Sequence, residues 1–331
     1  MSLLKIEKNL ISVIIVNWNG EKWFKDCLFS LYNQTFKKIE VLVVDNNSSD
    51  KSVEYLEKNF PKVKIIKNKK NVGLSTAFNI GVEKSKGEYI MLLNNDTFFK
   101  KDFVQKLFTF YKKHNYSVIA PIEKRFDEKE KIKCNTTIDI TGSPAYYLPN
   151  FSRWDKFFYL SVCFLFSRND YLASKGLDDN YFMYYEDVDW FWRLSLLGKK
   201  FTYVNDVIIS HAGGGSSGKG LNYNTFLWRN QNCLQTLIKN YSFLTLVFVL
   251  PIYIVQNLIE AIALIFVNPK ISKSYIQGWI FNIKNINKII KKRKWVQDHR
   301  VVSDLEIFKK MYPGSGKLLL LYNYFFQKNE K

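Results

Sequence analysis

Apolar and polar residues follow two different periodic patterns along the first two thirds of the chain. Short apolar runs rich in β-branched residues predict strands, whereas apolar residues spaced three and four apart predict helices. The predicted strands lie at residues 11–16, 40–44, 63–66, 89–93, 117–120 and 200–204, with a further ordered segment at 159–167. The predicted helices lie at residues 21–34, 52–59, 71–84 and 101–113, and a last one follows residue 190 to residue 197. Because strands and helices alternate, this pattern predicts an α/β fold with a mostly parallel, Rossmann-like sheet and right-handed crossovers.

Two polar segments interrupt this pattern. Residues 123–133 are charged and predict a loop-like insertion, and the Gly/Ser-rich residues 211–218 predict a flexible loop that marks the best domain boundary. A chain of 331 residues has room for one large α/β domain and an appendage. We therefore expect an α/β domain over residues 1–215 and a helical region, apolar and then basic, over residues 216–331.

The helical region contains a long apolar segment, Phe243–Val267, in which 20 of 25 residues are apolar. This length is enough to cross a bilayer, but Pro251 interrupts the segment and Glu260 lies in its second half. Because a carboxylate near the membrane centre costs ~2.5–3.5 kcal/mol, the segment predicts an interfacial or re-entrant helical pair rather than a simple span. The alternative is a buried helix, either inside a soluble domain or at the interface of a homo-oligomer.

Positive charge is concentrated behind this apolar segment. The chain carries 49 Lys and Arg against 30 Asp and Glu, a net charge of +19, and residues 268–331 contribute +10 of it, 14 basic minus 4 acidic. Basic residues such as Lys291–Lys294 would each gain ~1 kcal/mol near anionic lipid headgroups. We therefore expect an anionic membrane surface as a partner, contacted through about residues 243–294. Nucleic acid is not expected, because the basic residues do not form a stripe with exposed aromatic residues.

The N-terminus and the cysteines indicate a cytosolic chain. No apolar run precedes a small-residue cleavage site at the N-terminus, so no signal peptide is predicted. The four cysteines are scattered without metal-ligand spacing, and Cys27 and Cys163 lie in apolar surroundings that are typical of reduced core residues. Combined with the apolar and basic segments, this predicts a protein on the cytosolic face of the cell membrane.

Acidic and amide side chains follow the predicted strands at the points where the strands end. Asp96 follows the apolar run Tyr89–Leu93 after two asparagines, and Asp45 follows the predicted strand at residues 40–44. In an open α/β sheet, ligands bind beyond these carboxyl ends. Asp96 could hold a divalent cation against a diphosphate. Asp45 could accept hydrogen bonds from an imide N–H of a base or from ribose hydroxyls, although a helix cap or a turn is the ordinary alternative for either residue.

Three other residues surround the start of a predicted helix, where free N–H groups favour phosphate. They are Asn71, Gly73 and Asn79. A tight turn is the alternative role of Gly73.

Three acids lie within four residues in an aromatic segment, Glu186, Asp187 and Asp189. Clustered carboxylates among apolar walls have raised pKa values, which suits a general base. The alternative is a helix start with acids at its positive end, and Arg193 could pair with Asp189 one turn later.

His211 is one of three histidines and precedes the glycine run. Its imidazole beside Asp96 would complete a metal site of mixed oxygen and nitrogen ligands. The glycines that follow could close over phosphates or serve as a linker.

With these residues in view, the chain resembles family 2 glycosyltransferases over about residues 10–215. Five segments occur in the family's order, namely Ile14–Gly20, Val43–Asp50, Asn71–Gly73, Leu93–Asp96 and Tyr184–Asp189. The chain is similar to the rhamnosyltransferase-like branch, which builds polysaccharides and lipid-linked glycans. The resemblance implies a glycosyltransferase A fold that moves a hexosyl or rhamnosyl group, with inversion, from a UDP- or dTDP-sugar to a glycan or lipid-linked acceptor hydroxyl.

The resemblance also implies roles for residues at the matching positions. Asp187 would be the catalytic base, with Glu186 as the alternate, and Asp96 and His211 would bind Mg²⁺ or Mn²⁺. The expected substrate-binding residues are Val16, Asn17, Asn19, Asp45, Asn47, Asn71, Gly73, Asn79, Asn94, Asn95, Asp189, Trp190 and Arg193.

Two departures from the family pattern leave an alternative open. Asn94 replaces the first acid of the family's D-x-D motif, and the segment Leu160–Cys163 lacks the Gly-Ala often found there. A non-catalytic, membrane-associated sugar- or nucleotide-binding protein that retains the fold is therefore the alternative. A nucleotidyltransferase and a dinucleotide-dependent dehydrogenase are not expected, because no Gly-rich signature follows the first predicted strand.

Overall fold

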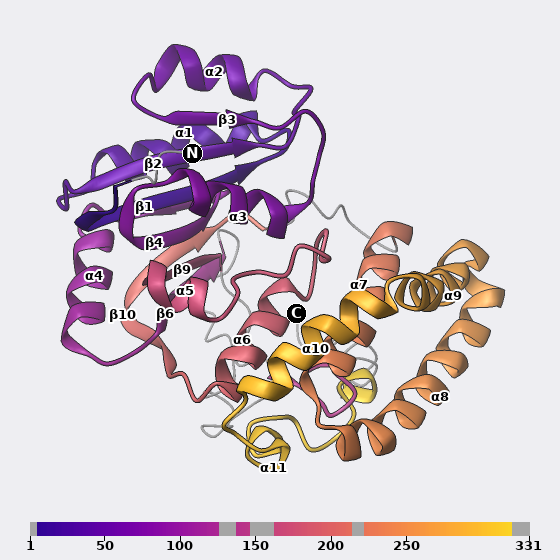
Figure 1. Ribbon diagram of the computed structural model, residues 1–331. Helices are drawn as coiled ribbons and strands as arrows, with labels where there is room; N and C mark the ends of the chain where they lie inside the picture. The colour runs from indigo at the N-terminus through magenta and orange to yellow at the C-terminus, as the bar shows by residue number, and fades with distance from the viewer. Residues whose placement is uncertain (1–4, 126–136, 146–161, 214–221, 320–331) are drawn as a thin grey trace, which may run out of the picture. The chain divides into compact units, whose positions relative to one another are not determined.

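The computed structural model describes residues 5–125, 137–145, 162–213 and 222–319 (Figure 1). The chain forms two compact units. Unit 1 comprises Met1–Lys133, Ser161–Met183 and Lys200–Gly218, and unit 2 comprises Cys134–Leu160, Tyr184–Lys199 and Lys219–Lys331. Each unit is described by itself below.

Unit 1 is built on an eight-stranded sheet of order β3-β2-β1-β4-β9-β6-β10-β5. Its strands are β1 (Glu7–Asn17), β2 (Ile39–Asp45), β3 (Lys64–Lys67), β4 (Gly87–Asn94), β5 (Thr97–Phe99), β6 (Val118–Arg125), β9 (Cys163–Ser167) and β10 (Phe201–His211). Four neighbouring pairs among these described strands are parallel and three are antiparallel, because β9 runs against both β4 and β6 and β5 runs against β10. The sheet is therefore mixed, and the expectation of a mostly parallel sheet needs this correction.

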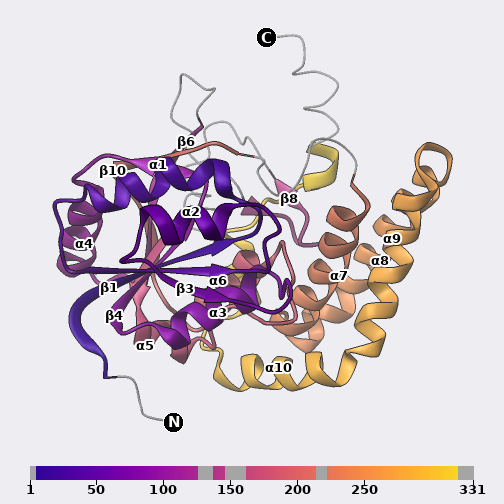
Figure 2. The ribbon, with the colours of Figure 1, turned by 90° about the horizontal axis from the view of Figure 1, so that it is seen from above.

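Helices cover both faces of the sheet. They are α1 (Glu21–Tyr32), α2 (Ser52–Asn59), α3 (Leu74–Lys84), α4 (Phe103–Lys113) and α5 (Arg168–Ala173). Because side chains alternate along a strand, Val13 and Ile15 of β1 enter a core with α1 and α4. Ile14 faces the other way, where a Cβ on Gly81 of α3 would come within 2.4 Å of it. Figure 2 shows α1 on one side of the strands and α3 and α5 on the other.

Most of the elements predicted for unit 1 are present, although many of them begin or end at other residues than predicted. The helix predicted over residues 52–59 is α2 itself. The strand predicted to stop at residue 120 continues through Pro121 to Arg125, so residues 123–125 of the predicted insertion belong to β6, while residues 126–133 lie outside the described residues. Proline in a strand argues against a central position, yet Pro121 pairs with Val204 of β10.

Unit 2 is mainly helical over the described residues. Its elements are the short strands β7 (Thr137–Ile138) and β8 (Pro144–Ala145) and the helices α6 (Glu186–Leu196), α7 (Tyr223–Asn240), α8 (Phe243–Val267), α9 (Pro269–Lys284), α10 (Ile286–His299) and α11 (Asp304–Phe308). α9 packs closely against α7, because a Cβ on Gly278 would lie 3.0 Å from the backbone nitrogen of Gln231. Ser272 of α9 also donates a hydrogen bond of 2.6 Å to the carbonyl of Ala261 in α8.

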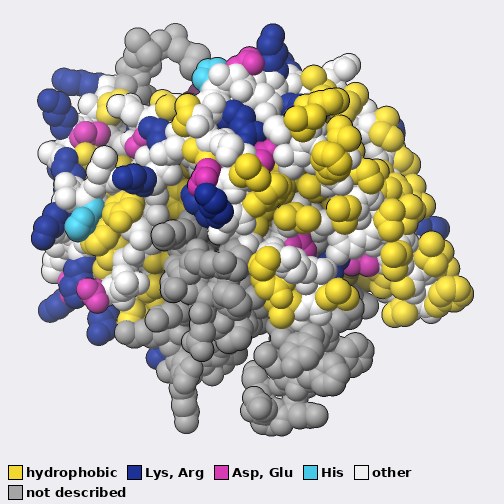
Figure 3. Space-filling view, turned by 90° about the horizontal axis from the view of Figure 1, so that it is seen from below, with side chains coloured by type: hydrophobic (Ala, Val, Ile, Leu, Met, Phe, Trp, Pro, Cys, Tyr) yellow, Lys and Arg dark blue, Asp and Glu magenta, His cyan; other side chains and the backbone are white. Residues whose placement is uncertain are grey.

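The apolar segment forms one continuous helix, α8, and this corrects the expectation of a helical pair. Pro251 lies inside α8 without ending it, although proline removes one backbone hydrogen bond there. In the described part of the chain, α8 is the one helix that is long and apolar enough to cross a membrane by length and composition. Much of its apolar surface is exposed, and Figure 3 shows apolar side chains gathered on the side of the molecule where α8 and α9 lie in Figure 1.

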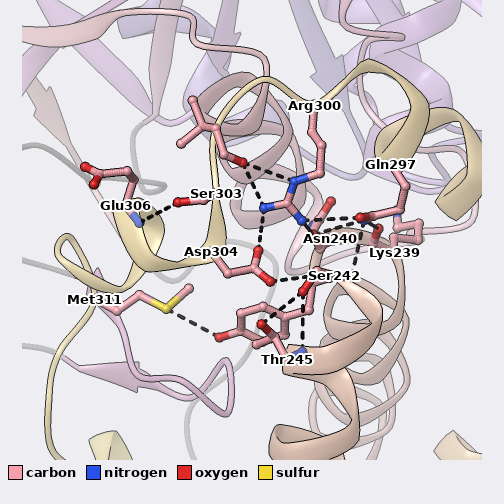
Figure 4. Close-up of polar contacts among 12 residues, drawn as sticks. Lys239, Asn240, Ser242, Thr245, Gln297, Arg300, Ser303, Asp304, Glu306 and Met311 are labelled. Atoms are coloured by element: carbon pink, nitrogen blue, oxygen red, sulfur yellow. Dashed lines mark hydrogen bonds and ion pairs between the residues drawn. The ribbon is translucent and has the colours of Figure 1, made fainter.

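Polar contacts hold the start of α8 in unit 2 (Figure 4). The Asp304 carboxylate accepts a hydrogen bond of 2.9 Å from the Ser242 backbone N–H and forms a 2.6 Å ion pair with Arg300. Burial by itself would raise the pKa of Asp304, but the hydrogen bonds from Thr245, Arg300 and Ser242 outweigh burial and lower it. The corner between α7 and α8 is therefore fixed by α11 and the end of α10.

Candidate functional site

Three parallel strands of unit 1 end at the same edge of the sheet. The register pairs Asn17 of β1 with Asp45 of β2, and Val16 of β1 with Asn94 of β4. Val16 and Asn94 are half-buried, whereas Asn17 and Asp45 are buried. The structure thus brings together the residues that the sequence placed at strand ends.

Asp45 is held by short hydrogen bonds at this edge. Its Oδ1 accepts from Asn17 Nδ2 at 2.8 Å and from the Ser48 hydroxyl at 2.6 Å, and its Oδ2 accepts from the Ser48 backbone N–H at 3.1 Å. Asn95 Nδ2 in turn donates to Asn17 Oδ1 at 3.2 Å. The carboxylate therefore stabilises the turn after β2, which is the ordinary alternative for this residue, while lone pairs on Oδ2 remain for a ligand.

Two loops next to this network approach each other closely. Asn19 and Asn47 both adopt positive φ, 53° and 62°, which asparagine tolerates better than most residues. Asn19 Oδ1 accepts a 2.8 Å hydrogen bond from the Ser49 N–H, which joins the loop after β1 to the loop after β2. A Cβ on Gly20 would lie 2.2 Å from Asn95 Nδ2, so a larger residue there would displace the Asn95 side chain. The hydrogen bond between Asn19 and Ser49 therefore holds the two loops together at the strand ends.

The start of α3 is shaped by Gly73. This glycine has a φ of +84°, and a Cβ on it would lie 2.6 Å from the Phe182 carbonyl, so both backbone conformation and space require glycine. Asn71 Oδ1 accepts from the Gly73 N–H at 3.0 Å. Asn79 lies one turn into the helix, where it donates to the Leu177 carbonyl and accepts from the Tyr171 hydroxyl at 2.6 Å. These contacts give Asn79 a structural role, and ligand binding by it stays a prediction.

Asp96 and His211 are in contact, although 115 positions separate them in the chain. His211 Nε2 lies 3.1 Å from Asp96 Oδ2, and His211 Nδ1 lies 2.7 Å from Glu123 Oε1. The antiparallel pairing of β5 with β10 places Thr97 opposite His211 and so sets Asp96 beside it. Burial by itself would lower the pKa of His211, but the hydrogen bonds with Asp96 and Glu123 outweigh burial and raise it to about 9.

Asp96 and His211 fit a divalent cation as two of its ligands. Their facing atoms, an oxygen and a nitrogen 3.1 Å apart, have about the spacing of two adjacent ligands that each lie about 2.1 Å from an octahedral ion. Among the described residues, no group of three or more His, Cys, Asp or Glu side chains could hold a metal ion alone. Glu123 contacts the opposite nitrogen of the imidazole, so it faces away from that point. Further ligands would come from phosphate oxygens and water, as is usual for Mg²⁺.

The acidic pair lies in unit 2 at the start of α6. Tyr184 and Tyr185, which precede it, both adopt left-handed φ values, 69° and 67°, and such strain in non-glycine residues clusters at functional sites. The Tyr184 carbonyl accepts a 2.8 Å hydrogen bond from Asn232 of α7, and the Tyr185 hydroxyl donates to the Gly142 carbonyl at 2.9 Å. Both tyrosines are thus anchored within unit 2.

Burial raises the pKa of Glu186, and burial together with the Glu186 charge raises the pKa of Asp187. Glu186 Oε2 is buried with no hydrogen-bond partner among the described residues. Asp187 is half-exposed, and its Oδ1 accepts from the Val188 N–H at 2.8 Å. This combination suits a carboxylate that takes up a proton near neutral pH.

Asp189 points into the core of unit 2. Its carboxylate forms ion pairs of 2.9 Å with Arg193 and with Lys239 of α7 and accepts from Asn240 at 3.1 Å. The predicted pairing of Asp189 with Arg193 is confirmed. Asp189 and Trp190 are fully buried and Arg193 nearly so. The contacts join α6 to α7, and a role of these three residues in substrate binding stays a prediction.

We expect Asp189→Asn to lower the free energy of unfolding by about 3–5 kcal/mol, because it leaves two buried cations without their carboxylate. Chemical denaturation of the full chain measures this loss. Glu57→Gln is the matched control, since it removes an exposed ion pair of 2.7 Å with Lys67, and such pairs contribute about 0–1 kcal/mol. Equal stabilities of the two variants would contradict a structural role of Asp189.

Glu123 is the site residue that the sequence did not reveal, because it seemed to open a charged loop. The apolar run Val118–Ile122 leads directly into it, and this continuity across Pro121 was the available signal. Gly213 is described, whereas most of the glycine-rich loop, residues 214–218, and residues 160 and 161 lie outside the described residues. Cys27 and Cys163 are buried in the core of unit 1, as predicted.

Comparisons with known proteins agree with this geometry. Residues 12–172 match the model of glycosyl transferase family 2. An uncharacterized glycosyltransferase of Haemophilus influenzae is 36% identical over 104 residues, which is 30% of this chain and 42% of that protein. The matches to the first relatives span 34–42% of those proteins' own lengths.

Solved structures share the fold. GalNAc-T7 with UDP, GalNAc and Mn²⁺ has a TM-score of 0.57 at 17% identity, covering 70% of this chain and 48% of that chain. The mannosyltransferase PcManGT of Pyrobaculum calidifontis with GDP-Man and Mn²⁺ has a TM-score of 0.54 at 13% identity, covering 96% and 88%. The fold is thus α/β, with a mixed sheet like that of glycosyltransferase A proteins and a C-terminal helical region. Over residues 12–172, just under half of the chain, the sequence is similar to glycosyl transferase family 2.

Proposed function

We propose that the protein is an inverting glycosyltransferase that moves a sugar from a nucleotide-diphosphate donor to an acceptor hydroxyl. The observation that carries the proposal is the Asp96–His211 contact of 3.1 Å beside the strand-end network of Asn17, Asp45 and Asn95. Carboxylate, imidazole and amide groups at one sheet edge suit a nucleotide diphosphate with a divalent cation. The match of residues 12–172 to the model of glycosyl transferase family 2 supports the same proposal.

In this proposal, unit 1 binds the donor. Asp45 and the amides around it contact the nucleoside of a UDP- or dTDP-sugar, and the N–H groups near Gly73 favour its phosphates. Mg²⁺ or Mn²⁺ held by Asp96 and His211 would, when bound, neutralise charge on the departing nucleotide diphosphate. GalNAc-T7 with UDP and PcManGT with GDP-Man, each solved with Mn²⁺, support this donor class and this cofactor.

Asp187 is the proposed general base, with Glu186 as the alternate. Its carboxylate takes the proton of the acceptor hydroxyl while that oxygen forms a bond to the anomeric carbon. The bond from this carbon to the diphosphate oxygen breaks in the same step, so the configuration inverts. A raised pKa makes the carboxylate a stronger base than an ordinary aspartate.

The proposal includes a hexosyl or rhamnosyl donor and a glycan or lipid-linked acceptor, although none of the proteins reported above carries the name of a rhamnosyltransferase. It assigns donor and acid–base chemistry to residues 1–215 and contact with the cytosolic membrane face to residues 216–331. The exposed apolar face of α8 supports the membrane contact.

Asp96→Ala should remove the Mn²⁺-dependent part of donor binding and lower sugar transfer, because one of two cation ligands is lost. A thermal-shift screen of UDP- and dTDP-sugars with and without Mn²⁺ first identifies the donor, and calorimetry then measures its affinity. Glu54→Gln on the exposed side of α2 is the control. If a nucleotide sugar is bound but not turned over, the enzyme proposal fails and the non-catalytic binding role takes its place. If no nucleotide sugar is bound, both proposals fail.

A further inference from the structure

Glu123 lies against the imidazole of His211 on the side opposite Asp96. Its Oε1 is 2.7 Å from Nδ1, and the two side chains come from neighbouring parallel strands, β6 and β10. Glu123 is only 7% exposed. A buried carboxylate is costly unless it is paired, so this contact is a strong constraint on both groups.

The contact determines which ring nitrogen can bind a cation. A carboxylate only accepts hydrogen bonds, so Nδ1 must carry the proton and donate it to Glu123. Nε2 faces Asp96 at 3.1 Å and by the same argument carries a proton when no cation is bound. It is then the nitrogen that can exchange its proton for a metal ion, while Nδ1 keeps its hydrogen bond to Glu123. The hydrogen bond also limits rotation of the ring about its Cβ–Cγ bond.

We propose that Glu123 is a positioning residue for the cation site: it holds His211 in the Nδ1–H tautomer with Nε2 directed at Asp96. A carboxylate in contact with the outer nitrogen of a ligand histidine orients the ring and raises its basicity. Glu123 itself does not touch the cation. The inference rests on the proposed function, which places a divalent cation at Asp96 and His211.

The test measures Mn²⁺ affinity rather than activity. Binding of Mn²⁺ to the full chain with UDP is followed by electron paramagnetic resonance of the free ion. Glu123→Ala should weaken Mn²⁺ affinity about 10- to 100-fold. Glu123→Gln should weaken it less, because the amide oxygen still accepts the Nδ1 hydrogen bond without supplying charge. Lys124→Gln, on the adjacent residue of β6, is the matched control and should leave the affinity unchanged.

A purely structural role of Glu123 predicts a different result. Both Glu123 variants would then unfold at lower temperature without metal, while the folded fraction would bind Mn²⁺ as tightly as the wild type, and this would overturn the inference. The variants Asp96→Ala and His211→Ala test the cation site itself, separately from the role of Glu123. If they leave Mn²⁺ affinity unchanged, the proposed cation site is wrong and the inference falls with it. If they weaken binding and Glu123→Ala does not, only the role of Glu123 is wrong.

Discussion

Asp187→Asn should lower the rate of sugar transfer about 100- to 10,000-fold, which is the usual contribution of a positioned general base, while donor affinity stays unchanged. The substitution keeps the shape of the side chain and the oxygen that accepts the Val188 N–H hydrogen bond of 2.8 Å. It removes the ability to take up a proton. Single-turnover transfer assays and calorimetric donor titration measure the two quantities separately. Normal turnover in this variant would exclude Asp187 as the base.

The pH dependence gives an independent check of the same assignment. A base acts only when it is deprotonated, and burial together with the Glu186 charge raises the pKa of Asp187. The transfer rate should therefore fall as the pH falls through this raised pKa, instead of staying level down to about pH 5 as for an ordinary aspartate with a pKa of ~3.9. Glu186→Gln removes the neighbouring charge, so it should shift the falling limb to lower pH. A rate that is independent of pH from 5 to 8 would contradict this.

Strand ends were predictable from the sequence because buried strands are apolar and stop abruptly at polar residues. Asp45 and Asp96 could be placed at one sheet edge in this way. The pairing of β5 with β10, which sets Asp96 beside His211, could not be predicted, because β5 has only three residues, Thr97–Phe99, and too few positions to show a period. The reversed direction of β9 has no local signal either, since the same apolar run fits a parallel or an antiparallel neighbour.

The three acids near residue 186 could be found from the sequence, but their separate roles could not be predicted from it. Their clustering predicted a site, but a helix turns by about 100° per residue, so neighbours in sequence face different surroundings. Asp189 meets Lys239, which lies 50 positions away in the chain and carried no signal of such a contact. Glu186 and Asp187 keep the properties expected of a base. The local pattern identified the acids but placed the helix after residue 190, whereas α6 begins at Glu186. The separate roles of the acids depend on tertiary packing.

Helices α8 and α9 expose many large apolar residues and bury several small or polar ones. The outward face of α8 is made of large apolar residues such as Phe248, which is 73% exposed, whereas Asn257 is buried on the opposite face. α9 buries Ile271 and Tyr275 together with the small and polar residues Ser272, Ser274, Gly278 and Asn282, and it exposes Ile276, Ile280 and Ile283. Small and polar residues between helices with apolar residues outside are typical of helices in lipid.

The Glu260 carboxylate, which seemed to argue against lipid contact, has partners in the structure. It accepts a 2.8 Å hydrogen bond from Tyr275 and forms a 2.7 Å ion pair with Lys317. Exposed basic residues of α9 and α10, namely Lys270, Lys273, Lys284, Lys288, Lys291 and Lys294, can meet anionic headgroups. Arg293 differs from them, because it donates a 2.6 Å hydrogen bond to the Tyr241 carbonyl. We therefore expect α8 to lie with its apolar face in the membrane surface.

The triple variant Phe248→Glu, Val255→Glu and Ile259→Glu should bind vesicles of phosphatidylcholine and phosphatidylglycerol at least about 100-fold more weakly than the wild type. Each of these exposed side chains would contribute about 1.5–3 kcal/mol when it leaves water for the bilayer, and a charged replacement loses that gain. Vesicle sedimentation at several salt concentrations measures binding, and Phe29→Glu, an equally exposed position on α1, is the control. The membrane proposal is wrong if the wild type does not bind these vesicles and light scattering shows that it is a dimer while the triple variant is a monomer. In that case, α8 packs against a second copy of the chain.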